Sequence, residues 1–232
     1  MLKSTINHSQ RQLGMVLNTW GGKRKGAGRK PRVPGRVPHL HRPALASRFP
    51  VHVTLRVDQS LPDLRDEGLS WQVEQCLRLG KGGERFRLVH YCIQTHHLHL
   101  IVEATNAEEL TAGIRGLCIR VARRLNRILR RQGRVFVDRY FARILRTPRE
   151  VRNSICYVLL NCRHHAAQHG RKLLPNWMDD CSSGRFFDGW RGGLNPPADE
   201  QPTVAAPGTW LLSTGWRRWG LLRIDEIPGP QP

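Results

Sequence analysis

Four short segments of the chain have the hydrophobic and polar patterns that are typical of β-strands. In residues 51–57, every second residue is apolar, and His52 and Thr54 lie between them, so one face of the strand is expected to be buried. Similar segments occupy residues 84–94, 97–104 and 133–145. The second and third are separated by a very short turn, which predicts a β-hairpin.

Three other segments have the three- and four-residue spacing of amphipathic helices. They cover residues 68–79, 107–131 and about 147–169. In the last of them, Thr147 is expected to be the N-cap, Pro148 to take the first helical position and Glu150 to complete a capping box.

The order of these elements is strand, helix, strand, strand, helix, strand and one further helix. This order predicts an α+β protein with a ferredoxin-like βαββαβ sheet and an added C-terminal helix. Residues 44–170 would form this domain. Residues 1–43 are expected to be a disordered basic tail, and residues 171–232 a C-terminal extension in which the Trp-rich segment 209–222 docks as a short helix.

Composition adds a strong positive charge. The chain has 38 Lys and Arg against 18 Asp and Glu, a formal net charge of +20. A polyanion is therefore the expected partner, with nucleic acid as the first candidate and an acidic membrane surface as the second. No apolar run is long enough to span a bilayer and no signal peptide is recognisable, so no membrane insertion is expected. The cysteines form no C-x-x-C pair, which disfavours a zinc ribbon and fits a reducing cytoplasm.

Two basic regions could bind DNA phosphates. The first is a basic cluster in the N-terminal tail, which could equally be a solvated segment. It consists of Lys23, Arg24, Lys25, Arg29 and Lys30. In the helix over 107–131, four arginines follow one face without an intervening acid, and their mutual repulsion would be relieved by a polyanion. These residues are Arg120, Arg124, Arg127 and Arg131.

The strand at 97–104 begins with histidines. His97 and His99 share one face, while His96 and Leu98 point to the other. Two imidazoles on one face of a buried strand suggest a metal site, although a pair of half-exposed histidines is the simpler interpretation.

The last predicted helix carries a polar stripe opposite its apolar one, formed by Tyr157, Asn161, His164 and Gln168. Such a stripe is ordinary on a solvated helix. Combined with the histidines, however, it offers a tyrosine that could attack a phosphodiester and an amide oxygen that could be a third metal ligand. A divalent cation, Mg²⁺ or Mn²⁺, would stabilise the charge that develops in that reaction.

The motif "HLH" at 97–99 and the segment "RVFVDRYFARILRTPREVRNSICYVLLN" at 134–161 resemble the single-tyrosine HUH transposases, especially the REP-associated tyrosine transposase-like group. The resemblance covers about residues 45–170. It implies that Tyr157 is the nucleophile that forms a 5′-phosphotyrosine, that His97, His99 and Asn161 bind the metal, and that the substrate is single-stranded or hairpin DNA. Many members have Pro-Asn where this chain has Thr95-His96, and a proline where it has Cys162.

Several alternatives remain open. The protein could be a domesticated, catalytically silent DNA-hairpin binder with a regulatory role, and RNA binding is a weaker third hypothesis because the strands show few aromatics. Tyr140 is a competing nucleophile. Acidic residues are too scattered to favour a two-metal nuclease. The sequence does not distinguish a monomer from a homodimer, and a cytoplasmic, nucleoid-associated location in a bacterium is expected.

Overall fold

The computed structural model describes residues 43–193 and 200–229, which belong to one compact unit of the chain. The predicted basic tail lies outside the described residues except for its last position, and so do all five of its candidate DNA-binding residues: Lys23, Arg24, Lys25, Arg29 and Lys30.

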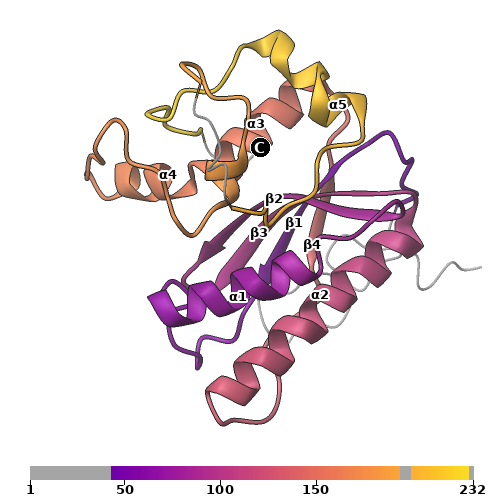
Figure 1. Ribbon diagram of the computed structural model, residues 1–232, viewed down its shortest axis with the longest axis vertical. Coiled ribbons are helices and arrows are strands. Elements are labelled where there is room, and N and C mark those ends of the chain that lie inside the picture. The colour runs from indigo at the N-terminus through magenta and orange to yellow at the C-terminus, as the bar shows by residue number, and fades with distance from the viewer. Residues whose placement is uncertain (1–42, 194–199, 230–232) are drawn as a thin grey trace, which may run out of the picture. The chain divides into compact units, whose positions relative to one another are not determined.

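A four-stranded antiparallel sheet forms the centre of this unit (Figure 1). Its strands are β1 (Val51–Arg56), β2 (Phe86–Gln94), β3 (His97–Ala104) and β4 (Phe141–Ile144), in the spatial order β2-β3-β1-β4. Helix α1 (Glu67–Leu79) joins β1 to β2, and α2 (Ala107–Ile128) joins β3 to β4. This is the ferredoxin-like arrangement. The predicted fold class and the β2–β3 hairpin are confirmed.

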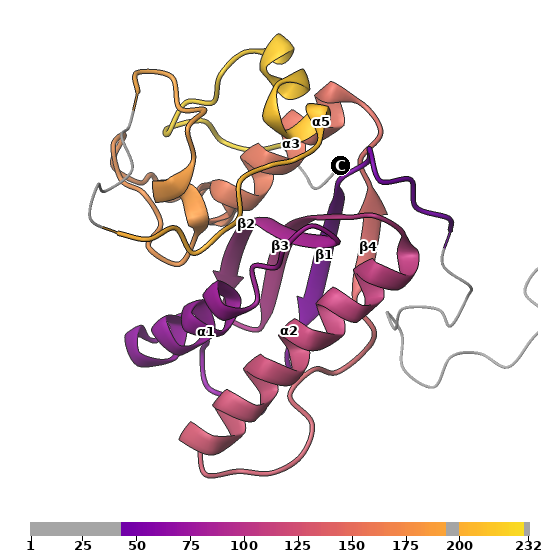
Figure 2. The ribbon, with the colours of Figure 1, turned by 45° about the vertical axis from the view of Figure 1, so that its right-hand side comes forward.

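The two faces of the sheet have different partners (Figures 1 and 2). The apolar side chains of β1, with Leu98 and Leu100 of β3, form a core with α1 and α2. The opposite face packs against α3 (Pro148–Leu159), which continues into α4 (Asn161–Gln168). None of the described helices is both long enough and apolar enough to cross a bilayer.

The fourth strand is shorter than predicted. The segment 133–145 contributes only Phe141–Ile144 to the sheet, with one isolated bridge between Phe136 and Val57. Around that bridge, the backbone N–H of Val137 donates to the carbonyl of Arg56 at 3.1 Å, but residues 137–140 form no regular ladder. Helix α2 likewise ends at Ile128 rather than at residue 131.

The predicted helix over 147–169 is two helices. Its start is as expected, since Thr147 and Glu150 form a complete capping box. At Leu160, however, φ is −112° and ψ is 22°, which departs from helical values and separates α3 from α4. Tyr157 therefore lies on α3 and Asn161 begins α4.

The segment after residue 170 packs against α3 and β2. It contains η1 (Ser183–Phe186), α5 (Trp210–Ser213) and η2 (Gly215–Trp219). Trp216 is fully buried beside Phe187 in the core that surrounds α3. The predicted Trp-rich docking segment thus forms a short helix with a tryptophan anchor, and it completes the core on this side of the sheet.

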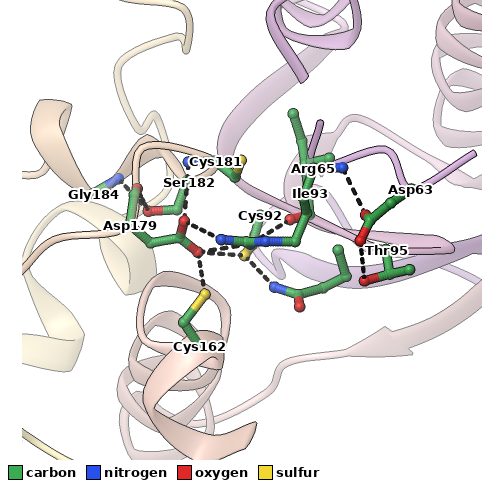
Figure 3. Close-up of polar contacts among 11 residues, drawn as sticks. Asp63, Arg65, Cys92, Ile93, Thr95, Cys162, Asp179, Cys181, Ser182 and Gly184 are labelled. Carbon is green, nitrogen blue, oxygen red and sulfur yellow. Dashed lines mark hydrogen bonds and ion pairs between the residues drawn. The ribbon is translucent and has the colours of Figure 1, made fainter. Parts of the chain in front are cut away.

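A buried carboxylate fastens the C-terminal segment to the domain (Figure 3). Asp179 accepts two hydrogen bonds from the guanidinium of Arg65, at 2.8 and 3.1 Å, and Arg65 also donates to the carbonyl of Ile93 in β2. The thiols of Cys162 and Cys92 donate to the same carboxylate. Burial raises the pKa of Cys162 to about 12, so this thiol keeps its proton. Asp179 therefore links α4 to β2.

We expect Asp179→Ala to lower the free energy of unfolding by about 3–5 kcal/mol, because it leaves the charge of Arg65 without its buried partner. Urea denaturation measures this. Asp188→Ala is the control: its side chain is 78% exposed and pairs with Arg217, so a loss of about 0–1 kcal/mol is expected. Equal losses in the two variants would contradict a structural role for the buried pair.

Candidate active site

The histidines of β3 lie on the sheet face that packs against α3. His97 and His99 point to that face, whereas Leu98 and Leu100 enter the core formed with α1 and α2. His99 is only 2% exposed and His97 is half-buried. His96 lies in the turn before the strand. The predicted alternation of His97, Leu98 and His99 is confirmed.

Strand β1 orients the ring of His99. Thr54 pairs with His99 across the two strands, and its hydroxyl lies 3.3 Å from Nδ1 of the imidazole. Nε2 of His52 lies 3.2 Å from the same nitrogen. These contacts direct Nε2 of His99 away from β1, and this buried atom has no hydrogen-bond partner among the described residues. Hydrogen bonding of one ring nitrogen commonly orients the other toward a metal.

Sequence analysis did not assign His52 and Thr54 to the site. The signal was present in the alternation of residues 51–57, where both are polar residues between buried ones. What the pattern lacked was the information that β1 and β3 are neighbours in the sheet.

Burial keeps the histidines of this cluster neutral. It lowers the pKa of His97 to about 4, with smaller contributions from His165 and Arg56, and it lowers the pKa of His52 to about 4, assisted by Arg143. The pKa of His99 also lies well below its usual value. At neutral pH these imidazoles are uncharged, which is the form that can bind a metal.

Tyr157 lies directly against the histidines. Its ring centroid is 5.2 Å from that of His99, in an edge-to-face contact, and 6.0 Å from that of His52. Burial raises the pKa of the Tyr157 hydroxyl, and the neighbouring Asn161 side chain partly offsets this. The ring of His164, from α4, is 5.6 Å from Tyr157.

The sequence predicted that the polar stripe lies opposite the core, but the structure places part of the stripe inside the core. Tyr157 is 7% exposed and Asn161 is fully buried, whereas Gln168 is exposed. The prediction was wrong because the helical pattern assumed a solvated outer face, while the sheet and the C-terminal segment enclose α3 from several sides.

Asn161 brings an unsatisfied amide to the same place. Its Oδ1 and Nδ2 are buried, and neither makes a hydrogen bond of normal geometry with a described residue. The other candidate metal donors are Nε2 of His99 and the ring of His97, whose centroid is 4.7 Å from that of His99. In the described part of the chain, no group of three or more His, Cys, Asp or Glu side chains could hold a metal, so such a site depends on this amide.

Tyr140, the competing nucleophile, belongs to the other side of the sheet. Its hydroxyl lies 3.1 Å from the hydroxyl of Thr111 on α2, and its ring is part of the core beneath α1 and α2. The sheet therefore separates Tyr140 from His97 and His99.

The predicted arginine face of α2 is also on that other side. Arg120 and Arg127 are exposed, Arg124 donates to Gln72 of α1, and Arg131 follows the end of the helix, where it donates to the carbonyl of Arg134. Two different arginines lie on the histidine face. Arg56 pairs with His97 across β1 and β3, and Arg143 pairs with His52 across β4 and β1.

Comparisons with known proteins found one solved structure to report. It is that of a REP-associated tyrosine transposase bound to a REP hairpin. The two chains are 12% identical with a TM-score of 0.49, and the similarity covers 75% of this chain and all of the other. No family model and no curated protein matches the sequence. The case for a function therefore rests on the chain's own residues.

Proposed function

We propose that the protein cleaves and rejoins single-stranded DNA through a covalent intermediate on Tyr157, with Mg²⁺ or Mn²⁺ bound by His97, His99 and Asn161. One observation carries this proposal: Nε2 of His99 and Oδ1 of Asn161 are buried near Tyr157, and neither atom makes a hydrogen bond of normal geometry with a described residue. A buried polar atom without a partner costs about 1–3 kcal/mol, and a bound ion is one way in which such a cost is offset.

In the proposed reaction, the Tyr157 hydroxyl loses its proton and its oxygen attacks the phosphorus of a phosphodiester. A bond from Oη to phosphorus forms, the bond from phosphorus to the 3′-oxygen breaks, and the departing oxygen takes up a proton. The products are a 5′-phosphotyrosine and a free 3′-hydroxyl, so a 3′-hydroxyl can later reverse the step and rejoin a strand. The bound cation would polarise a phosphoryl oxygen and stabilise the developing negative charge.

The surroundings of Tyr157 suit such an intermediate. His52 and Thr54 hold the ring of His99, so its free nitrogen has a defined direction before substrate binds. Tyr157 is only 7% exposed, so little bulk water surrounds the reacting oxygen.

A DNA substrate agrees with the charge. The net charge of +20 favours binding to phosphates, and Arg56 places part of that charge on the face that carries the histidines, whereas Arg143 is paired with Glu150 at 3.4 Å.

Incubation with single-stranded hairpin DNA tests the proposal. DNA labelled at its 3′-end should give a labelled protein species that resists denaturant, because a 5′-phosphotyrosine retains the downstream fragment. Mg²⁺ or Mn²⁺ should be required, and EDTA should prevent the reaction. DNA binding without any such species, with either metal, would instead support a catalytically silent hairpin-binding protein.

The orientation of His99 gives a prediction for metal affinity. His52→Ala combined with Thr54→Val removes both contacts to Nδ1, so the Mn²⁺ concentration for half-maximal adduct formation should rise about 10- to 100-fold. His90→Ala is the matched control, because His90 is buried on the same sheet face but packs against Phe187. A metal requirement that changes equally in both variants would contradict the orienting role.

A further inference from the structure

Two exposed tryptophans lie on the C-terminal segment, each with an arginine against its ring. Trp210 is 50% exposed and Trp219 is 53% exposed. The guanidinium carbon of Arg218 is 5.0 Å from the ring centroid of Trp210, and that of Arg149, from the first turn of α3, is 5.3 Å from that of Trp219. We call these four residues the tryptophan–arginine face.

The backbone beneath this face is firmly held. Arg152 of α3 donates from Nε to the carbonyl of Gly220, at 3.1 Å, and makes two further hydrogen bonds to Glu226. Trp216 anchors η2 in the core. Gly215 allows close packing, since a Cβ there would lie 2.7 Å from the Trp210 ring. The exposed rings are thus presented on a preorganised surface.

The charge of this surface is unbalanced. Neither Arg149 nor Arg218 forms an ion pair with any residue in the ranges 43–193 and 200–229. Two further arginines, Arg48 and Arg146, also form no ion pair with a described residue. Their guanidinium carbons lie 4.7 and 5.6 Å from the ring centroid of Phe49, just before β1. Exposed indole rings with unpaired guanidinium groups are the two elements from which single-strand binding surfaces are built: bases stack on the rings, and the cations bind phosphates.

We propose that the tryptophan–arginine face binds single-stranded DNA that flanks the phosphate cleaved at Tyr157, with bases stacked on Trp210 and Trp219. Arg149 and Tyr157 lie on the same helix, eight residues apart, which corresponds to about 12 Å along its axis. A strand leaving the histidine site along α3 would reach the face within a few nucleotides. That this strand is the substrate rests on the proposed function.

Binding of the full-length protein to two hairpins, one with and one without a single-stranded extension, tests this inference. The binding measurements contain EDTA, so that the DNA is not cleaved. Trp219→Ala and Trp210→Ala should each weaken binding of the extended hairpin about 5- to 150-fold and leave binding of the bare hairpin unchanged. Trp219→Phe should retain part of the affinity, because a smaller ring still stacks.

Trp71→Ala is the matched control. Trp71 is also 53% exposed but lies on α1, across the sheet from α3, so its removal should not change binding of either DNA. For binding of the extended hairpin, the logarithm of the affinity falls with the logarithm of the salt concentration. Arg149→Gln and Arg218→Gln should each make this slope shallower by about 0.7.

The outcomes separate this inference from the proposed function. Wild-type affinity of Trp210→Ala and Trp219→Ala for the extended hairpin would overturn the inference, even if a covalent adduct forms at Tyr157. Equal losses on both hairpins would also overturn it, because the face would then not be specific for the single strand. Tryptophan-dependent binding of the extension without any adduct would leave the inference standing and contradict the proposed function.

Discussion

Tyr157→Phe is expected to eliminate the covalent protein–DNA species completely. The substitution removes one oxygen and keeps the ring, so the contact with His99 and the surrounding core should persist. Without a nucleophilic oxygen no phosphotyrosine can form, whatever the metal concentration. Denaturing electrophoresis with 3′-labelled hairpin DNA measures the species, and binding of the same DNA should be close to that of the wild type.

Tyr140→Phe is the control for this experiment. Tyr140 is buried to a similar extent, at 8% against 7% exposure, but it contacts Thr111 on the opposite side of the sheet. This variant should still form the adduct, and the modified peptide of the wild type should map to residues 153–163. An adduct that persists in Tyr157→Phe would show that another residue is the nucleophile.

His99→Ala should lower the rate of adduct formation by about 100-fold or more. A metal that polarises a phosphoryl oxygen contributes several kcal/mol to the barrier, and each 1.4 kcal/mol is a factor of ten in rate. His97→Ala should have a similar effect. DNA affinity should change little in both, because we expect arginines to provide the phosphate contacts.

His96→Ala is the comparison for both histidines. His96 precedes β3 in the turn and is not among the proposed metal ligands, so its loss should affect the reaction far less. Rates of single-turnover cleavage at saturating Mn²⁺ provide the measurement. Equal losses in all three variants would contradict the assignment of the ligands to one face of the strand.

Much of the local structure could be predicted from the sequence. The alternation in residues 97–104 identified the face that carries His97 and His99, because side chains of any strand alternate between two faces. The capping box at Thr147 located the start of α3, since such a motif involves only neighbouring residues. The order of elements indicated the ferredoxin-like sheet, which the strand order β2-β3-β1-β4 confirms.

Features that depend on partners distant in the sequence were missed or wrong. The break at Leu160 and the burial of Asn161 follow from the sheet and the C-terminal segment that enclose α3 and α4, and helical periodicity contains no information about either. Three of the four predicted arginines, Arg120, Arg124 and Arg127, lie on α2 as expected, whereas Arg131 lies beyond its end. The position of α2 across the sheet from Tyr157 depends on the side on which each crossover packs.

The sequence by itself determined the order of the main strands and helices and which residues of β3 share a face, because these properties depend on local backbone geometry and the period of apolar residues. Only the tertiary structure decided that β1 lies beside β3, so that His52 and Thr54 orient His99. It also decided that Tyr157 meets the histidines and that Tyr140 does not. The physical reason is that strand pairing and the packing of helices on a sheet are set by the burial of apolar surface over the whole domain, which no single segment specifies.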